Sequence, residues 1–530
     1  MWFDALWDWL VWFWLHRVTR LVAAWLIALT SGALVLEYAW RVFHAEYRPN
    51  GNSGHTTIDF GGQWLMGAML VQGKGQELYN RDEQRKLLQV AYPKELEPPD
   101  DKKTEEEKLG DAENLMRWFM TKDRSADPAQ RPVGGPLYPP VHAIFFAPIG
   151  LFDPLTGYHI NQALSIVWAF LGGLGVSYLT RRRIWWPVAT TLILIYPGFK
   201  AGIQLGQNPP LTLCILIWGW ALLARGRPVA GGMVWGLLAF KPVWALAFLL
   251  VPLVARQWRF CLAMIGTGVA LGLATLPFVG LHSWFDWLEV GKVASRTYNT
   301  DQNWVFYSRD LLGLPRRWLL DFQISANERD RFDAALIGWA MLVACLEITL
   351  LLAALRKDQA KEPTGPPAAF LLMGAWLCCY HFMYYDVLLT ALPFFVLCAE
   401  PRRLLEPTFL AFTTIRGPEL PGDFAAYYRP LPGDDYPPPA PSLELGYRNF
   451  WVFNKIELNL FALLLLWEHA AANIYWGLTM TNGWMDRPLE LGVRVGGYYF
   501  PWDTLLLIVF WLWCGVRWLW QEQTPDTVCG

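Results

Sequence analysis

Long apolar segments constrain the fold of this chain more than any other feature. They approach or reach the ~20 apolar residues that a helix needs to cross the hydrocarbon of a bilayer. Of the 530 residues, 54% are hydrophobic and only 17% are charged. Because the apolar residues come in long blocks, the sequence predicts an all-α polytopic membrane protein. The blocks lie at residues 21–36, 160–179, 260–279, 334–355, 456–480 and 502–520.

The charge balance excludes nucleic acid as a partner. The formal net charge is -2, and no stretch carries the excess of Lys and Arg that neutralising phosphates requires. The eight cysteines lie in or beside apolar segments or at the C-terminus, so no disulfide framework or zinc spacing is available. Residues 1–16 are rich in Trp and contain Asp4 and Asp8, which predicts a helix in the membrane interface instead of a cleaved signal peptide.

Basic clusters predict the orientation of the spans, because they mark cytoplasmic ends. Between Arg20 and Arg181 one outward crossing must be balanced by one inward crossing, so residues 138–152 are expected to be re-entrant or half-buried. The expected total is about twelve spans, several of them shorter than ~20 residues and therefore packed inside a bundle or lining a cavity. The clusters lie at residues 17 and 20, 181–183, 225 and 227, 256 and 259, 356–357, 402–403, and 517.

This topology divides the chain into a core and appended parts. The core at 17–403 includes a large first outer loop at 45–136, whose stretch 94–131 is strongly charged and typical of a solvated surface. A proline-rich loop at 404–455 is expected on the cytoplasmic side, followed by a C-terminal pair of spans at 456–530.

Unusual polar motifs all fall on the outer side in this topology. Lys241 is the most unusual of them, because it lies between two short apolar segments with no acidic residue nearby in sequence. Burying an unpaired ammonium is costly, so we expect an anionic partner, either a side chain or a phosphate-bearing ligand. The motifs are Asp59, Tyr138-Pro139-Pro140, Gly206-Gln207-Asn208, Lys241-Pro242, and the run from Tyr380 through His381 to Asp386.

Each of these residues also has a structural alternative. Asp59 can cap the helix that begins near Gly61, and Lys241 can extend to the outer headgroups. The gathering of all the motifs on one face favours a functional site over these separate explanations. For the remaining residues, Gln207 and Asn208 can bond between helices, His381 can pack at an interface, and Asp386 can cap a helix or pair with a neighbour.

The order of the motifs along the chain is itself distinctive. Asp59 follows the first span, and the later motifs follow in turn: Leu137 to Pro140 with Ala147-Pro148, Gly206-Gln207-Asn208, the run from Arg225 to Pro242, and His381 to Asp386. Over about residues 21–398, this set resembles the polyprenyl-phosphate-mannose-dependent mannosyltransferases of glycosyltransferase family 87. Three parts of the chain depart from that pattern: the charged part of the first loop, the 404–455 loop and the last two spans.

The resemblance implies a GT-C fold, in which a bundle of membrane helices carries the active site at its outer surface. It also implies a lipid-linked sugar donor and a catalytic acid at the position of Asp59. The protein is then expected in a bacterial plasma membrane, with its active site on the extracytoplasmic face. The acceptor is expected to be a lipid or a glycan, and the oligomeric state is left open.

The predicted reaction moves mannose from polyprenyl phosphate to an acceptor hydroxyl, with inversion at the anomeric carbon. Asp59 is the predicted base, and Lys241 is the predicted partner of the phosphate. His381 is predicted to assist, through either the phosphate or a sugar hydroxyl. Because polyprenyl phosphate is already a charged leaving group, no metal or other cofactor is expected. The other candidates are Gln207, Asn208, Asp386 and Tyr138 for the sugar and its support, and Arg296 and Arg309 as alternatives for the phosphate.

A transporter or flippase of lipid-linked glycans is one alternative from another class. A membrane scaffold for envelope assembly is a second, and it would leave Lys241 and Asp59 individually replaceable. A transporter also places polar residues among short, broken helices, but it uses sites near the middle of the membrane. The polar motifs here favour the outer face, which favours the transferase.

Overall fold

The computed structural model is helical throughout its described part. Two residues outside the helices, Ser308 and Met383, form an isolated antiparallel β-bridge. The prediction of an all-α fold is therefore confirmed for the described residues. These are 17–45, 59–91, 137–300, 302–321, 331–399, 457, 459–466 and 501–520. The predicted interfacial helix at 1–16, the charged stretch at 94–131 and the proline-rich loop at 404–455 lie outside them.

Five helices of the described part are long and apolar enough to cross a membrane. A sixth candidate is the pair α10 (Trp186–Ile195) and α11 (Phe199–Leu205), which bends by 70° at a short break containing Pro197. These helices make the chain an integral membrane protein. The five are α2 (Arg17–Ala45), α9 (Pro154–Leu179), α15 (Trp258–Val279), α19 (Phe332–Leu355) and α25 (Trp502–Trp520).

Shorter apolar helices fill the space between the long ones. The centre of the bundle is built from α12 (Pro209–Ala224), α20 (Gly365–Leu377) and α21 (Ala391–Cys398), whose side chains are almost all buried. Helices this short cannot face lipid along a full crossing, so burial inside protein suits their length. The others are α4 (Asp59–Val71), α8 (Val141–Gly150), α13 (Pro228–Gly236) with η3 (Leu237–Phe240), α14 (Pro242–Val254), and η5 (Tyr384–Thr390), which leads into α21.

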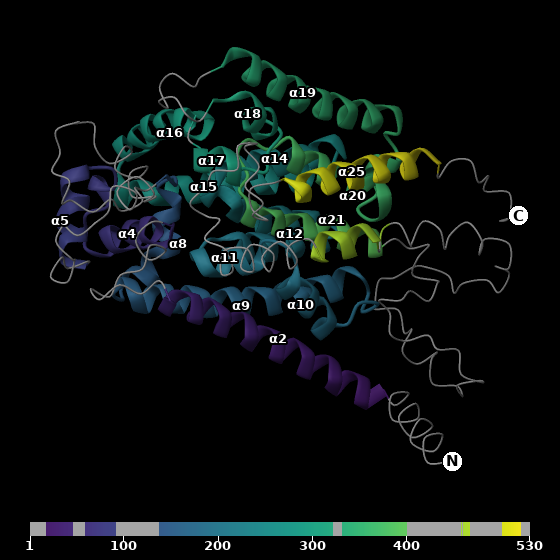
Figure 1. Cartoon of the computed structure of the whole chain (residues 1–530), viewed down its shortest axis with the longest axis horizontal. Coiled ribbons are helices and arrows are strands. Elements are labelled where there is room, and N and C mark those ends of the chain that lie inside the picture. Colours follow the sequence, from purple (N-terminus) through teal and green to yellow (C-terminus); the bar gives the residue numbers. More distant parts are fainter. Residues whose placement is uncertain are drawn as a thin grey trace, which may run out of the picture.

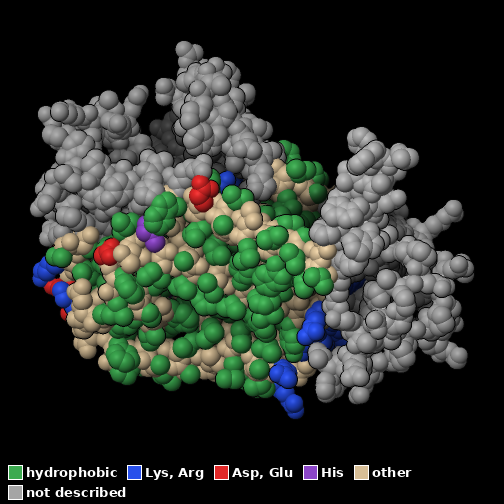
Figure 2. Space-filling model, turned by 90° about the horizontal axis from the view of Figure 1, so that it is seen from below, with side chains coloured by type: hydrophobic (Ala, Val, Ile, Leu, Met, Phe, Trp, Pro, Cys, Tyr) green, Lys and Arg blue, Asp and Glu red, His purple; other side chains and the backbone are tan. Residues whose placement is uncertain are grey.

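Exposed apolar side chains cover the outside of the long helices. On α15, for example, Leu262 is 71% exposed and Leu273 is 60% exposed. Figure 2 shows hydrophobic side chains over most of the described surface on the side of α2, with Lys and Arg side chains near its edges. An apolar surface of this extent is typical of contact with lipid.

The basic clusters of the sequence meet at one end of the bundle. Arg225 donates from Nη2 to the carbonyl oxygen of Tyr178 at 2.7 Å. Arg183 donates to the carbonyl oxygen of Cys398 at 3.5 Å. In Figure 1 the first turn of α2 and the last turn of α25 lie toward the same side, on the right. Other contacts at this end join Trp518 to Gln359 and Gln257 to Lys361.

The opposite end carries the remaining short elements and the close pair of α4 and α8. A Cβ added at Gly67 of α4 would lie 2.1 Å from the carbonyl oxygen of Phe146 of α8, so only glycine allows this approach. The ten-residue α8 is too short to cross a bilayer alone. In Figure 1, α4, α8, α5 (Arg81–Ala91) and α16 (His282–Thr300) lie toward the left. The other short elements are η1 (Gly75–Glu77), α17 (Gln302–Tyr307), α18 (Gly313–Leu319) and, at the basic end, η4 (Gln359–Lys361).

Candidate active site

Lys241 lies at the break between η3 and α14, where Pro242 starts the new helix. Its ammonium nitrogen is 3.8 Å from the centre of the Trp244 ring and 5.5 Å from that of Tyr138, within the range of cation–π attraction. No side chain of the described residues forms an ion pair with it within 4.0 Å. Burial lowers the pKa of Lys241 to about 8, and the charge of Asp386 opposes this shift. A half-buried cation is therefore held mainly by aromatic faces.

The Gly206-Gln207-Asn208 motif forms the turn between α11 and α12. Gly206 has a left-handed φ of 67°, and an added Cβ would lie 2.9 Å from the Cβ of Phe60. Its carbonyl oxygen accepts hydrogen bonds of 2.9 Å from Gln63 of α4 and from Asn161 of α9. Gln63 follows Asp59 by one helical turn, so this contact anchors the start of α4 at the motif.

Tyr138 connects this turn to Lys241. Its hydroxyl donates to Oε1 of Gln207 at 3.0 Å, while its ring lies under the ammonium of Lys241. On its other side the ring stacks on His142 at a centroid distance of 4.1 Å. The sequence prediction missed His142, although it follows Tyr138 by four residues on the same face of the entry to α8.

His381 lies on the other side of Lys241, in the segment between α20 and η5. Its ring stacks on Tyr298 of α16 at 3.6 Å between centroids. Nδ1 is 4.0 Å from Oδ2 of Asp310, a second residue that the motif search missed. Burial lowers the pKa of His381 to about 4; Asp310 opposes this shift and Lys241 adds to it. The imidazole is therefore neutral at pH 7.

Asp386 is buried at the start of η5. Its Oδ2 accepts the backbone N–H of Met383 at 3.0 Å, which is the capping contact that the sequence left open as an alternative. Its Oδ1 is also buried and has no hydrogen-bond partner among the described residues. Since Asp386 acts electrostatically on Lys241, one carboxylate both caps a helix and balances the cation.

Two arginines, Arg309 and Arg296, were predicted as alternative phosphate ligands, and the structure describes the side chain of Arg309. Arg309 is 1% exposed, and its Nε donates to Oδ2 of Asp503 in α25 at 2.6 Å. Nη1 donates to the carbonyl oxygen of Ser308 at 3.0 Å. Arg309 thus joins the outer segment to α25 through Asp503, and its role as a phosphate ligand stays a prediction. Arg296 belongs to α16, but its side chain lies outside the described part.

Asp59 is the first residue of α4, and its side chain also lies outside the described part. Its backbone position agrees with both sequence hypotheses, since a helix start can hold a capping acid or a base facing the site. The anchoring of Gln63 on Gly206 brings the first turn of α4 to the motif that Tyr138 contacts.

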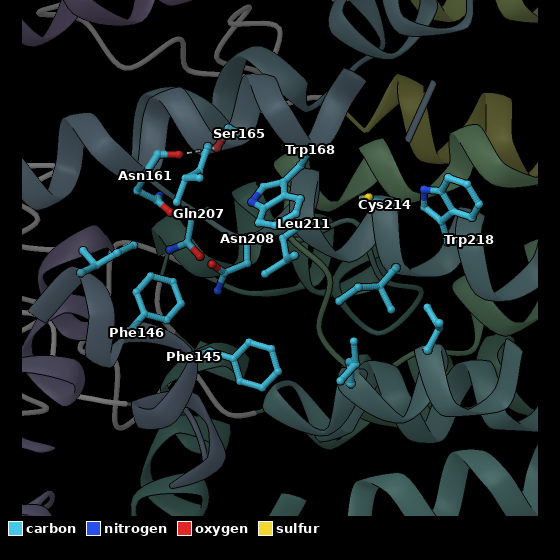
Figure 3. A pocket seen from close by; sticks show the side chains of 15 residues that line it. Phe145, Phe146, Asn161, Ser165, Trp168, Gln207, Asn208, Leu211, Cys214 and Trp218 are labelled. Carbon is cyan, nitrogen blue, oxygen red and sulfur yellow. Dashed lines mark hydrogen bonds between the residues drawn. The ribbon is translucent and has the colours of Figure 1, made fainter. Parts of the chain in front are cut away.

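A cavity of about 400 Å³ opens between α8, α9, α12 and α13. Asn161, Gln207 and Asn208 lie at one end of it in Figure 3, and Cys214 and Trp218 lie at the other. The remaining wall is almost wholly apolar and includes Phe145, Phe146, Ile149, Leu164, Leu211, Ile215 and Leu237. Because Gln207 accepts from Tyr138, the polar end of the cavity and Lys241 meet at the same tyrosine.

The comparison with known proteins assigns the chain to a family. Residues 137–401 match glycosyltransferase family 87, and this span is half of the chain. The chain belongs to glycosyltransferase family 87. The family confirms the resemblance drawn from the order of the motifs and makes this protein a membrane glycosyltransferase. The chain has no match among curated proteins and none among solved structures.

The family 87 region contains Tyr138, Lys241 and His381 together with the cavity. It begins after Asp59 and ends before Asp503. Two contacts therefore tie parts outside the matched region to parts within it, Gln63 to Gly206 and Asp503 to Arg309.

Among the residues of this family 87 protein that the structure describes, no group of three or more His, Cys, Asp or Glu side chains is arranged to hold a metal ion. The expectation of a reaction without metal or other cofactor stays a prediction.

Proposed function

We propose that this family 87 enzyme transfers mannose from a polyprenyl phosphate to a hydroxyl of a lipid or glycan acceptor, at the extracytoplasmic face of a bacterial plasma membrane. The observation that carries the proposal is the junction at Tyr138. A cation suited to a phosphate lies over its ring, and its hydroxyl reaches the polar end of a long apolar cavity. A polyprenyl phosphate sugar combines the same features: a charged group, a polar sugar and an apolar chain.

The proposed topology has about twelve crossings in a GT-C bundle, with α4 and α8 at the outer surface. Its support is the separation of charge described above. Turns with basic clusters contact one another at one end, as Arg225 does with Tyr178. The contacts of Lys241 and His381 lie at the other end of the same helices. Basic clusters mark the cytoplasmic side, so the site would face outward.

In the proposed reaction the acceptor oxygen attacks the anomeric carbon from the side opposite the phosphate. The bond between that carbon and the phosphate oxygen breaks, and its electron pair leaves with the polyprenyl phosphate. Asp59 takes the proton of the acceptor hydroxyl, and Lys241 stabilises the phosphate as its charge grows. One displacement of this kind inverts the anomeric configuration, so a β-linked donor gives an α product.

The cavity is the proposed site of the polyprenyl chain, which gives a first test. Leu211→Trp would fill part of the cavity, and we expect the KM for a long-chain donor to rise about 10-fold because apolar contact area is lost. A water-soluble short-chain donor should be affected much less. The assay measures transfer of labelled sugar in reconstituted vesicles with both donors.

Leu262→Trp is the matched control for this change. Leu262 is 71% exposed on the outside of α15 and does not line the cavity, so its replacement should leave both KM values unchanged. Equal effects of Leu211→Trp on the two donors would contradict the assignment of the cavity to the lipid chain.

Tyr138→Phe tests the junction itself. It removes the hydroxyl that donates to Gln207 while keeping the ring under Lys241. We expect kcat/KM to fall about 5- to 10-fold, the usual effect of one lost hydrogen bond. Tyr138→Leu also removes the aromatic face and should cost more. Initial rates of transfer at low donor concentration measure the difference, and equal rates for the wild type and Tyr138→Phe would argue against the junction.

A further inference from the structure

His381 and Asp310 approach each other beside Lys241, and the proposed reaction gives neither of them a step. Nδ1 of the imidazole lies 4.0 Å from Oδ2 of the carboxylate, and the two side chains are 17% and 5% exposed. The separation is longer than a hydrogen bond, so the contact as it stands is electrostatic. The stack of His381 on Tyr298 leaves the ring little freedom to turn away.

The carboxylate of Asp310 is itself held on both oxygens. The hydroxyl of Ser308 donates to Oδ2 at 2.6 Å, and the backbone N–H of Gly313 donates to Oδ1 at 2.6 Å. Since each oxygen has its own donor, the carboxylate cannot rotate without losing both bonds. Oδ2 therefore stays on the side of His381.

The backbone fixes the distance between the two residues. His381 has a left-handed φ of 63°, a conformation that is unfavourable for residues other than glycine. Two contacts hold the segment in that shape: the backbone N–H of Arg309 donates to the carbonyl oxygen of Phe382 at 2.6 Å, and Ser308 and Met383 form the β-bridge. Strained backbone that its surroundings hold in place is often functional.

We propose that Asp310 is a positioning residue for His381: it keeps the proton on Nδ1, so that Nε2 can accept a hydrogen bond from a sugar hydroxyl of the donor or acceptor. The use of this hydroxyl in catalysis rests on the proposed function. The assignment differs from phosphate binding, because an unprotonated Nε2 has a lone pair and no hydrogen to offer a phosphate.

The charged and titratable groups around the ring agree with a neutral imidazole. Asp310 faces Nδ1, Lys241 acts on the ring from the start of α14, and Tyr298 and Tyr380 pack beside it. Burial and Lys241 together lower the pKa of His381 to about 4, in spite of Asp310. Asp310 therefore selects the tautomer without making the ring cationic.

Asp310→Asn gives a sharp test, because the two donors to the carboxylate differ. The N–H of Gly313 can only donate, whereas the hydroxyl of Ser308 can turn and accept instead. The amide oxygen should therefore stay toward Gly313, and the NH₂ should replace the Oδ2 that faces His381. Nδ1 would then become an acceptor, and the proton would move to Nε2. We expect kcat/KM to fall about 10- to 100-fold, since Nε2 can no longer accept from the hydroxyl.

The experiment measures the imidazole tautomer directly by nitrogen NMR. The full chain is labelled on histidine and held in lipid nanodiscs at pH 7, and the signal lost in His381→Gln assigns the residue. We expect a proton on Nδ1 in the wild type and on Nε2 in Asp310→Asn. Asp286→Asn is the control, because Asp286 pairs with His282 and should leave the His381 signal unchanged.

A second readout is the double variant. If Asp310 acts through His381, Asp310→Asn should add almost nothing to the loss of kcat/KM caused by His381→Gln. A role confined to folding would instead reduce activity further and leave the tautomer alone.

The outcomes separate this inference from the proposed function. An Nε2 proton in the wild type overturns the inference even if Asp310→Asn fails to fold. An unchanged tautomer in a folded Asp310→Asn also overturns it, whether or not the enzyme transfers sugar. If Asp310→Asn switches the tautomer but the wild type itself transfers no sugar, the positioning role is supported and the proposed function is overturned instead.

Discussion

Replacing Asp59 with Asn is expected to abolish most of the sugar transfer, with a loss in kcat of about 100-fold or more, because a general base contributes that much to a proton-transfer step. The amide keeps the size of the side chain and can still cap α4, so the helix start should persist. Donor binding should change little, since the phosphate and the polyprenyl chain are assigned to other residues. Transfer of labelled sugar and binding of a labelled donor are measured on the same vesicles.

Asp153→Asn is the matched control for Asp59. Asp153 caps α9 through the N–H of Thr156, a contact that asparagine also makes, and it lies outside the proposed site. This variant should transfer sugar at the wild-type rate. Near-normal transfer by Asp59→Asn would remove Asp59 from the mechanism and leave helix capping as its role.

Replacing Lys241 with Met is expected to lower kcat/KM by about 100-fold or more, the usual cost of losing a group that stabilises charge in the transition state. The methionine keeps the apolar contacts with Trp244 and Tyr138 but removes the attraction to the phosphate. It also leaves the buried Asp386 without its counter-charge. Measuring donor affinity separately from kcat shows whether the cation acts in binding or in the reaction.

Lys292→Met controls for the loss of a lysine at the same end of the bundle. Lys292 is exposed on α16 and pairs with Glu289, so its removal should leave kcat/KM unchanged. A Lys241→Met enzyme with near-normal kcat/KM would show that the aromatic cage of Lys241 is structural.

The pH profile gives an independent check on Lys241. Because its pKa is lowered to about 8, the ammonium loses its proton as the pH rises through that value. We therefore expect kcat/KM to fall above about pH 8, since this ratio reports on the free enzyme. Lys241→Arg keeps its charge over the whole range and should lose this basic limb. A limb that persists in the arginine variant would belong to another group.

The apolar helices could be predicted from the sequence, but their lengths in the structure differ. Blocks such as 260–279 and 334–355 became single helices, α15 and α19, because length and apolarity alone make a helix long enough to span. The segment at 186–205 broke instead into two helices bent by 70°. Pro197 lies at the break, because proline cannot continue a helix, whereas the angle depends on how α11 packs in the bundle.

The candidate site could be predicted only in part. Three site residues are distinctive in the sequence. Lys241 and Gln207 are polar residues between apolar segments, and Tyr138 directly precedes two prolines. The structure brings all three together. Asp310 was missed because no sequence pattern distinguishes this acid, although the neighbouring Arg309 was a candidate. Asp310 matters because its side chain approaches His381, which lies 71 positions later in the chain.

Arg309 has a partner that only the tertiary structure shows. In the sequence it is a basic residue in an outer loop, and a phosphate is a reasonable partner for it. In the structure, Nε of Arg309 donates a hydrogen bond of 2.6 Å to Oδ2 of Asp503 in α25. A contact between residues 194 positions apart cannot be inferred from local pattern, because no periodicity relates the two segments.

The sequence by itself determined that this chain is a helical membrane protein of family 87, and which polar residues stand out at the ends of its spans. These properties follow from the lengths of the apolar segments and the positions of the charges beside them. Both act on each span separately, so they can be recognised in the local sequence. The tertiary structure decided which of the polar residues are partners. Lys241 lies against aromatic rings, His381 against Asp310, and Arg309 against Asp503, because such pairs depend on distances set by the packing of helices far apart in sequence.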